Sequence, residues 1–416
     1  MTHVGTFLGT GLCLFVFVQL LMQTAQSAQR VLTGRRQSTL RTQQIREQLQ
    51  ELRQRHERVR VFADDWKGFR KFEVARKVVE TENCVSIYLR PHDGRPLPAF
   101  KPGQYLTFSA KIPGSDRPLV RCYSLSDAPR PDYYRITVKR VPAPADQPGL
   151  PPGRISSHFV QELRTGDILD VKSPSGTFCL DLESRRPVVL LAGGIGITPL
   201  LSMLRGVVEE GRDREVYLFY GIANSNHHTF REQLESLAAE SSNVRIHTAY
   251  SRPLEQDKMG REYDSPGRID LKLLRSVLPS NNFDFFVCGP PTFMQDVLGS
   301  LRAWGVPEQS IHAEAFGPAA ATPRRETKSA GLTCQVHFDR SGKTVVWNTV
   351  GQTLLELAET QGVVIDSGCR TGNCGACSTA IKSGQIEYLS EPGTPPAPGT
   401  CLPCISCPKG ELSLDA

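Results

Sequence analysis

Residues 367–378 read Ser-Gly-Cys-Arg-Thr-Gly-Asn-Cys-Gly-Ala-Cys-Ser, and this stretch holds three cysteines, Cys369, Cys374 and Cys377. Four residues separate the first pair and two separate the second, and a further cysteine, Cys404, follows near the end of the chain. This spacing is typical of thiolates that hold a [2Fe–2S] cluster, because a tight loop must turn three sulfurs toward one centre. Interspersed glycines let the backbone approach the sulfurs closely. The sequence therefore predicts a carrier of single electrons.

Zinc is the alternative for a cysteine cluster, but structural zinc sites usually pair their cysteines as C-x2-C, and a first gap of four residues is atypical of them. Cys401, Cys404 and Cys407 form a C-x2-C-x2-C run from which the fourth ligand must come. We favour Cys404, because Leu402-Pro403-Cys404 resembles the Leu-Ala-Cys segment that carries the last ligand in plant-type ferredoxins. On this interpretation Cys401 and Cys407 are unligated thiols.

The chain has 416 residues, which is too long for one hydrophobic core and predicts several domains. Its net charge of +6 arises in the first 60 residues, where nine arginines outnumber three glutamates, so the remainder is balanced. Such local basicity argues against nucleic acid as a partner of the globular part. Because a cluster is assembled in a reducing compartment, we expect no disulfide framework and catalytic domains that face the cytoplasm.

An uncharged, largely apolar stretch at residues 4–22 precedes the basic segment. As an α-helix, a stretch of this length just spans the hydrocarbon core of a bilayer. A cleaved signal peptide is the alternative, with small residues at 25–28, but no lysine or arginine precedes the apolar stretch. By the positive-inside rule we expect a single-pass membrane anchor over residues 1–30, with the N-terminus outside and the lipid bilayer as a partner.

Residues 31–65 are expected to form a basic helical spacer. The part between Arg36 and Arg60 contains neither glycine nor proline and repeats apolar residues at steps of four, three and seven. A short coiled coil, contact of the arginines with anionic lipid, and a solvated spacer all remain open interpretations.

Three globular domains are expected after the spacer. Residues 66–184 alternate apolar and polar residues over short stretches such as 85–89, 105–108 and 134–138, which predicts an antiparallel β-barrel. Residues 185–317 alternate strands with helical stretches, which predicts a doubly wound α/β sheet. The strands are expected at 187–192, 215–222, 244–250, 283–288 and 311–315, and helices at 198–208 and 230–239.

The remaining residues form a linker and a third domain. Residues 318–331 are rich in alanine, proline and charge and are expected to be the linker. Residues 332–416 contain the cysteine loop and are expected to form an α+β ferredoxin domain of the β-grasp type. Thr353-Leu354-Leu355-Glu356 is a capping box that starts a helix before that loop.

Arg121-Cys122-Tyr123-Ser124-Leu125-Ser126 is an R-x-Y-S-x-S string that resembles the flavin strand of the ferredoxin–NADP reductase superfamily. The resemblance covers roughly residues 68–318. It implies that Arg121 binds phosphate, that the Tyr123 ring stacks on the isoalloxazine and that the Ser124 hydroxyl lies near flavin N5. Cys122 is assigned to the flavin site as part of the string, and Tyr105 matches a further flavin-contacting position.

Gly153-Arg154-Ile155-Ser156 fits the G-x-x-S segment of that superfamily, whose N–H groups at a helix start meet the flavin phosphates. A plain turn is the alternative interpretation of Gly153 and Ser156. Together with Arg121 the segment indicates FAD, because two phosphates need more donors than one. FMN remains the alternative, since phthalate-dioxygenase-type reductases share this domain order and use FMN.

The nicotinamide side is indicated by Gly193-Gly194-Ile195-Gly196-Ile197-Thr198-Pro199, which follows an apolar strand and opens a helix. Proline replaces the third glycine of the Rossmann fingerprint, so the loop departs from that pattern and resembles the loop of the reductase superfamily instead. Gly193, Gly194, Gly196 and Thr198 are therefore assigned to the NAD(P)H pyrophosphate, which the helix N-terminus favours.

Cys288-Gly289-Pro290 resembles the C-G-P motif of the superfamily, with the cysteine beside the nicotinamide; a buried strand-end cysteine is the alternative. Glu314, Phe316, Gly317 and Pro318 belong to a segment that resembles the one that closes over the flavin. The resemblance thus implies a catalytic set of Ser124, Cys288 and Glu314. Arg252 follows a strand where the 2′-phosphate of NADPH would lie, but it would equally stack on adenine with NADH bound.

The first two domains also resemble the reductase half of flavohaemoglobins, at 69–72, 139–140 and 315–318. Where a flavohaemoglobin has a globin, this chain has the expected anchor, so nitric oxide dioxygenation within the chain is not expected. The C-terminal ferredoxin resembles the layout of oxygenase reductases.

The expected enzyme is an NAD(P)H oxidoreductase in which FAD accepts a hydride and the cluster passes single electrons to a membrane-associated acceptor protein. That acceptor is expected to be of oxygenase, hydroxylase or desaturase type. A haem, globin or hybrid-cluster acceptor, or a membrane-tethered redox sensor, are the alternatives.

Overall fold

The structure is a computed structural model that describes residues 66, 68–113, 118–143, 149, 151–210, 213–316, 333–348, 352–368, 370, 372, 375–390, 392 and 396–416. The expected anchor and spacer, residues 1–65, and the linker at 318–331 lie outside these residues. Among the helices that the structure describes, none combines the length and the apolar character needed to cross a bilayer.

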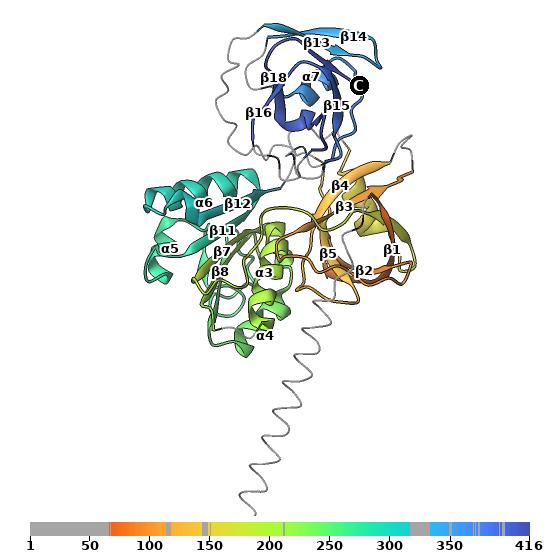
Figure 1. Ribbon diagram of the computed structural model, residues 1–416. Helices are drawn as coiled ribbons and strands as arrows, with labels where there is room; N and C mark the ends of the chain where they lie inside the picture. Colours follow the sequence, from red (N-terminus) through yellow and green to blue (C-terminus); the bar gives the residue numbers. More distant parts are fainter. Residues whose placement is uncertain are drawn as a thin grey trace, which may run out of the picture. The chain divides into compact units, whose positions relative to one another are not determined.

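An antiparallel six-stranded sheet forms the first domain (Figure 1). Its strands follow the order β4-β3-β6-β1-β2-β5. Its strands are β1 Arg70–Thr81, β2 Cys84–Pro91, β3 Tyr105–Ala110, β4 Leu119–Ser124, β5 Tyr134–Lys139 and β6 Ile168–Val171. A bridge between Leu125 and Ile136 joins the two edges of the sheet, so the predicted barrel is confirmed. The short helix α2 (Arg154–Ser157) and the turn His158–Glu162 add Ile155 and Phe159 to the barrel core.

The second domain is a parallel six-stranded sheet in the order β10-β9-β8-β7-β11-β12. Its strands are β7 Val188–Gly193, β8 Val216–Ile222, β9 Val244–Tyr250, β10 Ser265–Pro266, β11 Asp284–Gly289 and β12 Ile311–Ala315. Its helices are α3 Ile197–Glu209, α4 Arg231–Glu240, α5 Leu271–Val277 and α6 Pro291–Ala303. Helices α3 and α4 lie on one face of the sheet and α5 and α6 on the other (Figure 1). Their buried side chains belong to two separate cores, which confirms the doubly wound fold.

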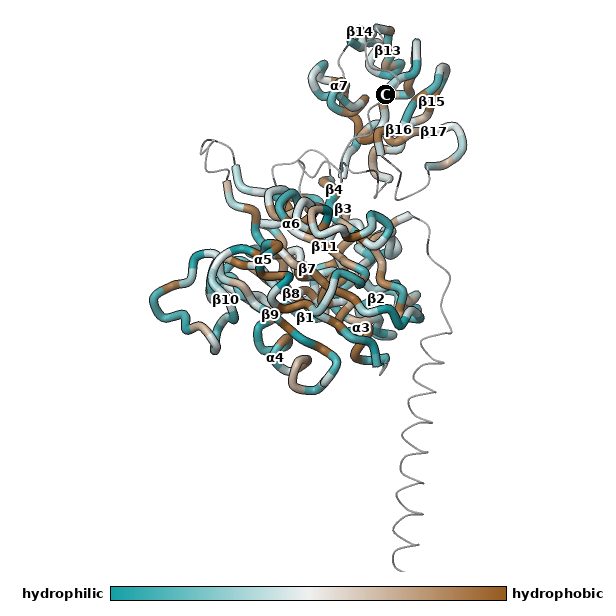
Figure 2. Tube along the Cα trace, turned by 90° about the vertical axis from the view of Figure 1, so that its left-hand side faces the viewer, coloured by the Kyte–Doolittle hydropathy of each residue, from teal (hydrophilic) through white to brown (hydrophobic). Residues whose placement is uncertain are grey.

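Burial explains why the central strands are apolar on both faces. Each residue of β7 is buried, because helices cover both sides of the sheet, and Figure 2 colours this central region as hydrophobic. The chain runs outward from β7 to β10 and then returns to β11 on the other side of β7. Ligands of such sheets bind at this switch point, beyond the carboxyl ends of the strands.

The described part of the third domain contains a five-stranded mixed sheet and an α-helix, as expected for an α+β ferredoxin. The sheet order is β14-β13-β19-β15-β17, and β16 and β18 form a second small sheet. The strands are β13 Cys334–Phe338, β14 Lys343–Trp347, β15 Thr379–Ser383, β16 Ile386–Tyr388, β17 Thr400–Cys401, β18 Ser406–Pro408 and β19 Leu412–Leu414. Helix α7 (Leu354–Thr360) begins at the predicted capping box: Glu356 N donates to Thr353 Oγ1 (3.1 Å), and Thr353 N donates to Glu356 Oε2 (2.7 Å).

Candidate flavin, nicotinamide and cluster sites

The R-x-Y-S string lies on β4 and divides between the two faces of that strand. The register pairs Tyr105 with Ser124 and Thr107 with Cys122, and the Cys122 Sγ lies 3.4 Å from Thr107 Oγ1. Successive side chains alternate along a strand, so Tyr123 lies on the opposite face from Cys122 and Ser124. The structure therefore brings Tyr105 and Ser124 together at the end of β4, on the face that also holds Cys122.

Tyr123 and Arg121 occupy the other face of β4. The Tyr123 ring centroid lies 5.4 Å from that of Phe159 and 5.8 Å from that of Phe108, and burial raises the pKa of its hydroxyl above the ordinary range. Arg121 is exposed, and its Nη1 donates to the Val120 carbonyl (2.7 Å). A neutral ring beside an exposed guanidinium fits the isoalloxazine and phosphate of a flavin.

Gly153 and Ser156 form a tight turn at the start of α2. A Cβ on Gly153 would lie 2.7 Å from Ser156 Oγ and 2.9 Å from Val141 Cβ, so only glycine fits. The Ser156 hydroxyl accepts from Val141 N (3.1 Å) and donates to Gly153 O (3.0 Å). The Ser156 hydroxyl is thus hydrogen-bonded within the chain. The groups of the turn that would bind a phosphate are its backbone N–H groups.

The glycine loop after β7 packs backbone to backbone on the end of β11. Ala192 pairs with Cys288 in the sheet, and a Cβ on Gly196 would lie 2.2 Å from Cys288 O. A Cβ on Gly193 or Gly289 would meet the Phe293 ring at 2.7 and 2.6 Å. Gly194 has a φ of +53°, which only glycine adopts readily.

The start of α3 completes this arrangement. Thr198 Oγ1 donates to Ile195 O (3.0 Å) and holds the first turn of the helix, while Pro290 is the N-cap of α6. Two helices therefore begin side by side, at the ends of β7 and β11. Their N-terminal N–H groups suit a pyrophosphate, so the predicted NAD(P)H residues lie together.

Cys288 and Glu314 are neighbours across β11 and β12. Complete burial, and then the charge of Glu314, raise the pKa of the Cys288 thiol well above its ordinary value. The side chain is therefore a neutral thiol rather than a nucleophilic thiolate. Phe316 N donates to Gly289 O (3.5 Å), whereas Gly317 and Pro318 lie outside the described residues.

Cys179 connects the two sides of the site, and the sequence interpretation missed it. Its pKa is raised to about 11, first by burial and then by the charge of Glu314. Its Sγ donates to Gly176 O (3.4 Å), and a Cβ on Gly176 would lie 2.9 Å from the Tyr105 ring. Glu314 of the parallel sheet is thus close to the barrel segment that packs on Tyr105. Cys179 belongs to no motif, so only the fold could reveal it.

Arg252 lies at the carboxyl ends of β8 and β9. Its backbone N donates to Ala223 O (2.8 Å), and its side chain is exposed. The pKa of the His227 imidazole is lowered first by burial, then by the charge of Lys139 and then by the charge of Arg252. This position is compatible with either nicotinamide cofactor, so the NADPH role of Arg252 stays a prediction.

Two predicted cluster ligands lie together in the third domain. The Sγ atoms of Cys377 and Cys404 are 3.2 Å apart, and both residues belong to a small core of their own with Ile405. Cys401 and Cys407 belong to the larger core of the domain instead. Adjacent thiols fit two ligands of one iron atom.

The other two predicted ligands, Cys369 and Cys374, lie outside the described residues. Between them, Gly372 has a φ of +75°, and a Cβ there would lie 2.3 Å from Ile405 Cδ1. Within the described part of the chain no group of three or more metal-ligating side chains is found, and that search includes only half of the predicted ligand set. The four-cysteine assignment therefore stays a prediction.

Comparison with known families finds a flavin-binding, a nicotinamide-binding and a cluster-binding domain in the same order along the chain. Residues 81–179 match the oxidoreductase FAD-binding domain, residues 190–298 the oxidoreductase NAD-binding domain and residues 336–409 the 2Fe-2S iron-sulfur cluster binding domain. The FAD-binding match favours FAD over FMN.

Individual relatives cover different parts of the chain. The flavohemoprotein of Halalkalibacterium halodurans is 42% identical over 254 residues, which are 61% of this chain and 61% of that protein. The FAD/NAD-binding domain of nitric oxide dioxygenase from Vibrio cholerae is 33% identical, with a TM-score of 0.54, over 61% of this chain and 100% of the domain. This chain therefore spans less than two thirds of the flavohemoprotein.

Phthalate dioxygenase reductase resembles nearly the whole described chain. It is 30% identical, with a TM-score of 0.51, and the match covers 84% of this chain and 98% of that protein. The shared domain order makes this chain an NAD(P)H oxidoreductase that holds FAD and a [2Fe–2S] cluster. It belongs to the ferredoxin–NADP reductase superfamily, among the reductases that carry a C-terminal 2Fe-2S domain as phthalate dioxygenase reductase does.

Proposed function

We propose that this reductase serves an oxygenase-, hydroxylase- or desaturase-type acceptor at a membrane. The observation that carries the proposal is the union, in one chain, of a flavin strand, a nicotinamide loop and a ferredoxin domain with adjacent thiols on Cys377 and Cys404. A type IV self-sufficient cytochrome P450 monooxygenase is 25% identical over 84% of this chain, with a TM-score of 0.58. A monooxygenase that contains the same three-domain unit supports an oxygenase as the acceptor.

The chain contributes positioning rather than proton transfer. A bound FAD would supply hydride acceptance from NAD(P)H and release of single electrons, and a bound cluster would carry those electrons. Tyr105 and Ser124 mark the flavin side, and the glycines of residues 193–196 allow the backbone to approach the nicotinamide cofactor closely. Cys288 offers a neutral, unreactive thiol at the strand end, because burial and Glu314 keep it protonated. No step needs a general base.

Residues 1–30 are proposed to anchor the reductase in a membrane, with residues 31–65 as a basic spacer and the catalytic domains in the cytoplasm. The apolar stretch at 4–22 and the arginines that follow it support this orientation. We expect the full chain to float with lipid vesicles, and a chain that lacks residues 1–60 to remain in solution, retain flavin and reduce ferricyanide with NAD(P)H. A truncated chain that aggregates or loses flavin would show that residues 1–60 belong to the fold instead.

Identification of the acceptor tests the proposed function directly. The full chain is cross-linked in intact membranes, solubilised and purified, and the proteins that accompany it are identified. We expect an oxygenase, hydroxylase or desaturase that the purified reductase reduces with NAD(P)H. Recovery of a globin or a hybrid-cluster protein, reduced in the same way, would contradict the proposal.

A haem acceptor is the second candidate, because a flavohemoprotein matches 254 residues of this chain at 42% identity. A separate globin would then receive the electrons. A membrane-tethered redox sensor is a weaker candidate, since a sensor needs no complete hydride site. Slow turnover of NAD(P)H with every one-electron acceptor tried would favour the sensor.

A further inference from the structure

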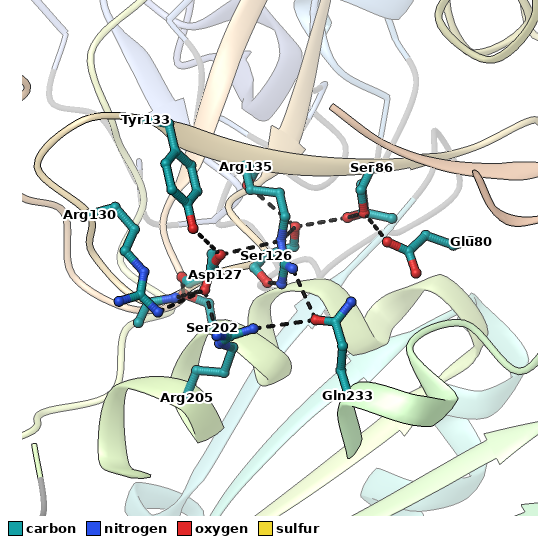
Figure 3. A network of polar contacts seen from close by, with 12 residues as sticks. Glu80, Ser86, Ser126, Asp127, Arg130, Tyr133, Arg135, Ser202, Arg205 and Gln233 are labelled. Atoms are coloured by element: carbon teal, nitrogen blue, oxygen red, sulfur yellow. Dashed lines mark hydrogen bonds and ion pairs between the residues drawn. The ribbon is translucent and has the colours of Figure 1, made fainter. Parts of the chain in front are cut away.

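Asp127 lies just beyond the flavin strand and is almost completely buried. β4 ends at Ser124, and Asp127 lies in the loop that leads to β5. Its side chain is 4% exposed, and it accepts a hydrogen bond at Oδ2 from the Tyr133 hydroxyl (2.9 Å). The charges of Arg130, Arg135 and Arg205 surround it (Figure 3). A carboxylate so deeply buried is retained only where its partners compensate the loss of water.

Two contacts join Asp127 to helix α3 of the parallel-sheet domain, here called the nicotinamide domain. The Ser202 hydroxyl donates to the Asp127 carbonyl (2.7 Å), and Arg205 Nε lies 2.9 Å from Asp127 Oδ1 (Figure 3). Helix α3 starts directly after the glycine loop at residues 193–196. Asp127 therefore connects the flavin strand to the helix that begins at the nicotinamide loop.

The arginines of the barrel extend this network across the same boundary. Arg135, whose side chain is 1% exposed, donates from Nη1 to Gln233 Oε1 on α4 (3.0 Å), and Arg205 Nη1 donates to the same oxygen (3.3 Å). Arg130 pairs with Glu209, the last residue of α3. Removing the charge of Asp127 would leave these guanidinium groups with too few carboxylates, so their mutual repulsion would loosen the boundary.

An apolar contact supports α3 at a second point. A Cβ on Gly103, two residues before Tyr105, would lie 2.6 Å from Met203 Cε, and a Cβ on Gly206 would lie 3.0 Å from Pro102 Cγ. The helix is thus held against the barrel by close packing near Tyr105 and by the polar network near Ser124. Loss of the polar contact leaves the apolar contact as a point about which α3 can rotate.

We propose that Asp127 is a positioning residue for hydride transfer, which sets the distance between the nicotinamide and the flavin by holding α3 against the end of β4. In that step the C4–H bond of the dihydronicotinamide breaks, and the hydrogen with both electrons forms a bond to flavin N5. The nicotinamide is left oxidised and the flavin reduced. Reacting atoms must approach to about 3–3.5 Å, so small displacements of α3 change the rate steeply. This inference rests on the reductase activity and adds a residue that touches neither cofactor.

Asp127→Asn, which keeps the shape of the side chain, tests the proposal. At saturating NAD(P)H, stopped-flow reduction of the flavin should slow by about 10- to 100-fold. The long-wavelength absorption of nicotinamide stacked on flavin should weaken. Flavin content, and the affinity for ADP-ribose measured by calorimetry, should stay at wild-type values, because the flavin strand and the nicotinamide domain remain folded.

Glu235→Gln is the matched control, since Glu235 pairs with Arg231 within α4 (2.9 Å), beside Gln233 but away from the boundary. It should leave flavin reduction unchanged. If Asp127→Asn does not fold, Arg205→Gln removes the contact from the nicotinamide side and should slow flavin reduction by about tenfold.

Wild-type flavin reduction and wild-type long-wavelength absorption in Asp127→Asn and Arg205→Gln would overturn the proposal. Loss of ADP-ribose affinity would also overturn it, because it would assign the network to the folding of the nicotinamide domain. Failure of the wild-type chain to reduce its flavin with NAD(P)H would instead contradict the reductase assignment itself.

Discussion

The cysteines of this chain are distinguished by their neighbours rather than by burial, since Cys288, Cys377, Cys401, Cys404 and Cys407 are all buried. Cys288 and Cys401 are buried thiols; burial, and then the charge of Cys377, raise the pKa of Cys401 to about 12, while a hydrogen bond with Ser406 acts in the opposite direction. Such groups stay protonated and pack as small apolar side chains. Cys377 and Cys404 instead have adjacent sulfurs, so within the C-x2-C-x2-C run the geometry favours Cys404 as the predicted ligand, while Cys401 and Cys407 belong to the larger core.

Replacing these cysteines singly tests the fourth ligand. We expect Cys404→Ser to lose the cluster, because its sulfur is the one beside Cys377. Cys401→Ser and Cys407→Ser should keep it, since these thiols belong to the larger core. Iron and labile sulfide per chain, with the visible absorption spectrum, provide the measurement. Retention of the cluster in Cys404→Ser, or a stoichiometric zinc content in place of iron, would refute the assignment.

His228 gives the nicotinamide domain a pH dependence of its own. The ring lies between Tyr220 and Tyr250, with Nδ1 2.9 Å from the Tyr250 hydroxyl, and burial followed by Arg231 lowers its pKa to about 4. Below the ordinary pKa of about 6.5 the unfolded chain binds a proton that the folded chain does not, so the free energy of unfolding falls as the pH drops toward 4.

Between pH 7 and pH 5 this single group should lower the free energy of unfolding by about 2 kcal/mol. His228→Gln removes the titrating group, so the melting temperature of the variant should fall less over the same pH interval. Thermal unfolding followed at both pH values measures the difference. Equal shifts in the variant and the wild type would show that other groups cause the pH dependence.

At the scale of elements, α3 and α6 start beside each other because the glycine loop before α3 packs closely on the backbone at the end of β11. A Cβ on Gly196 would lie 2.2 Å from the Cys288 carbonyl oxygen and 2.7 Å from Gly289 N, and these are backbone atoms, which cannot move aside as a flexible side chain would. We expect Gly196→Ala to cost about 1–3 kcal/mol of unfolding free energy. It should also weaken binding of ADP-ribose.

Gly299→Ala is the control for this change, because Gly299 lies within α6 and no atom lies within 4 Å of its added Cβ. An alanine there should leave ADP-ribose binding intact and stabilise the helix by up to about 1 kcal/mol. Calorimetric binding and thermal unfolding of both variants decide the point. Wild-type stability and affinity in Gly196→Ala would contradict the close packing.

The periodicity of apolar residues predicted the strands and helices well, because apolar side chains recur where the element is buried. It could not predict the exact ends of these strands and helices. β9 and β12 have the predicted bounds, whereas β7 starts and ends one residue later than expected. Helix α4 starts at Arg231 rather than at Phe230, since Phe230 takes a left-handed backbone conformation at φ 66°. A left-handed conformation in a bulky residue cannot be predicted from the pattern of apolar residues.

The candidate site could be proposed from the sequence where its motifs are local, but not where it depends on tertiary contacts. The flavin string, the glycine loop and the cysteine loop can each be recognised from a few consecutive residues. The engagement of the Ser156 hydroxyl with Val141 and Gly153 was not predicted, and neither were the roles of Cys179 and Asp127. Those depend on residues brought together only by the folded chain.

For the whole molecule, the order of domains implies the order of electron flow. The residues assigned to the hydride site belong to the barrel and the parallel sheet, between Tyr105 and Phe316, and the strands of the ferredoxin domain start at Cys334. Flavin reduction should therefore not require the cluster, while delivery of single electrons to a protein acceptor should.

Stopped-flow kinetics of a Cys377→Ser variant test this central claim most directly. NAD(P)H should bleach the flavin of the variant at close to the wild-type rate, because Cys377 belongs to the ferredoxin domain and to no part of the hydride site. Reduction of cytochrome c by the same variant should fall to background. Unchanged cytochrome c reduction would show that electrons leave directly from the flavin, and would contradict the assignment of the cluster as the outlet of this reductase.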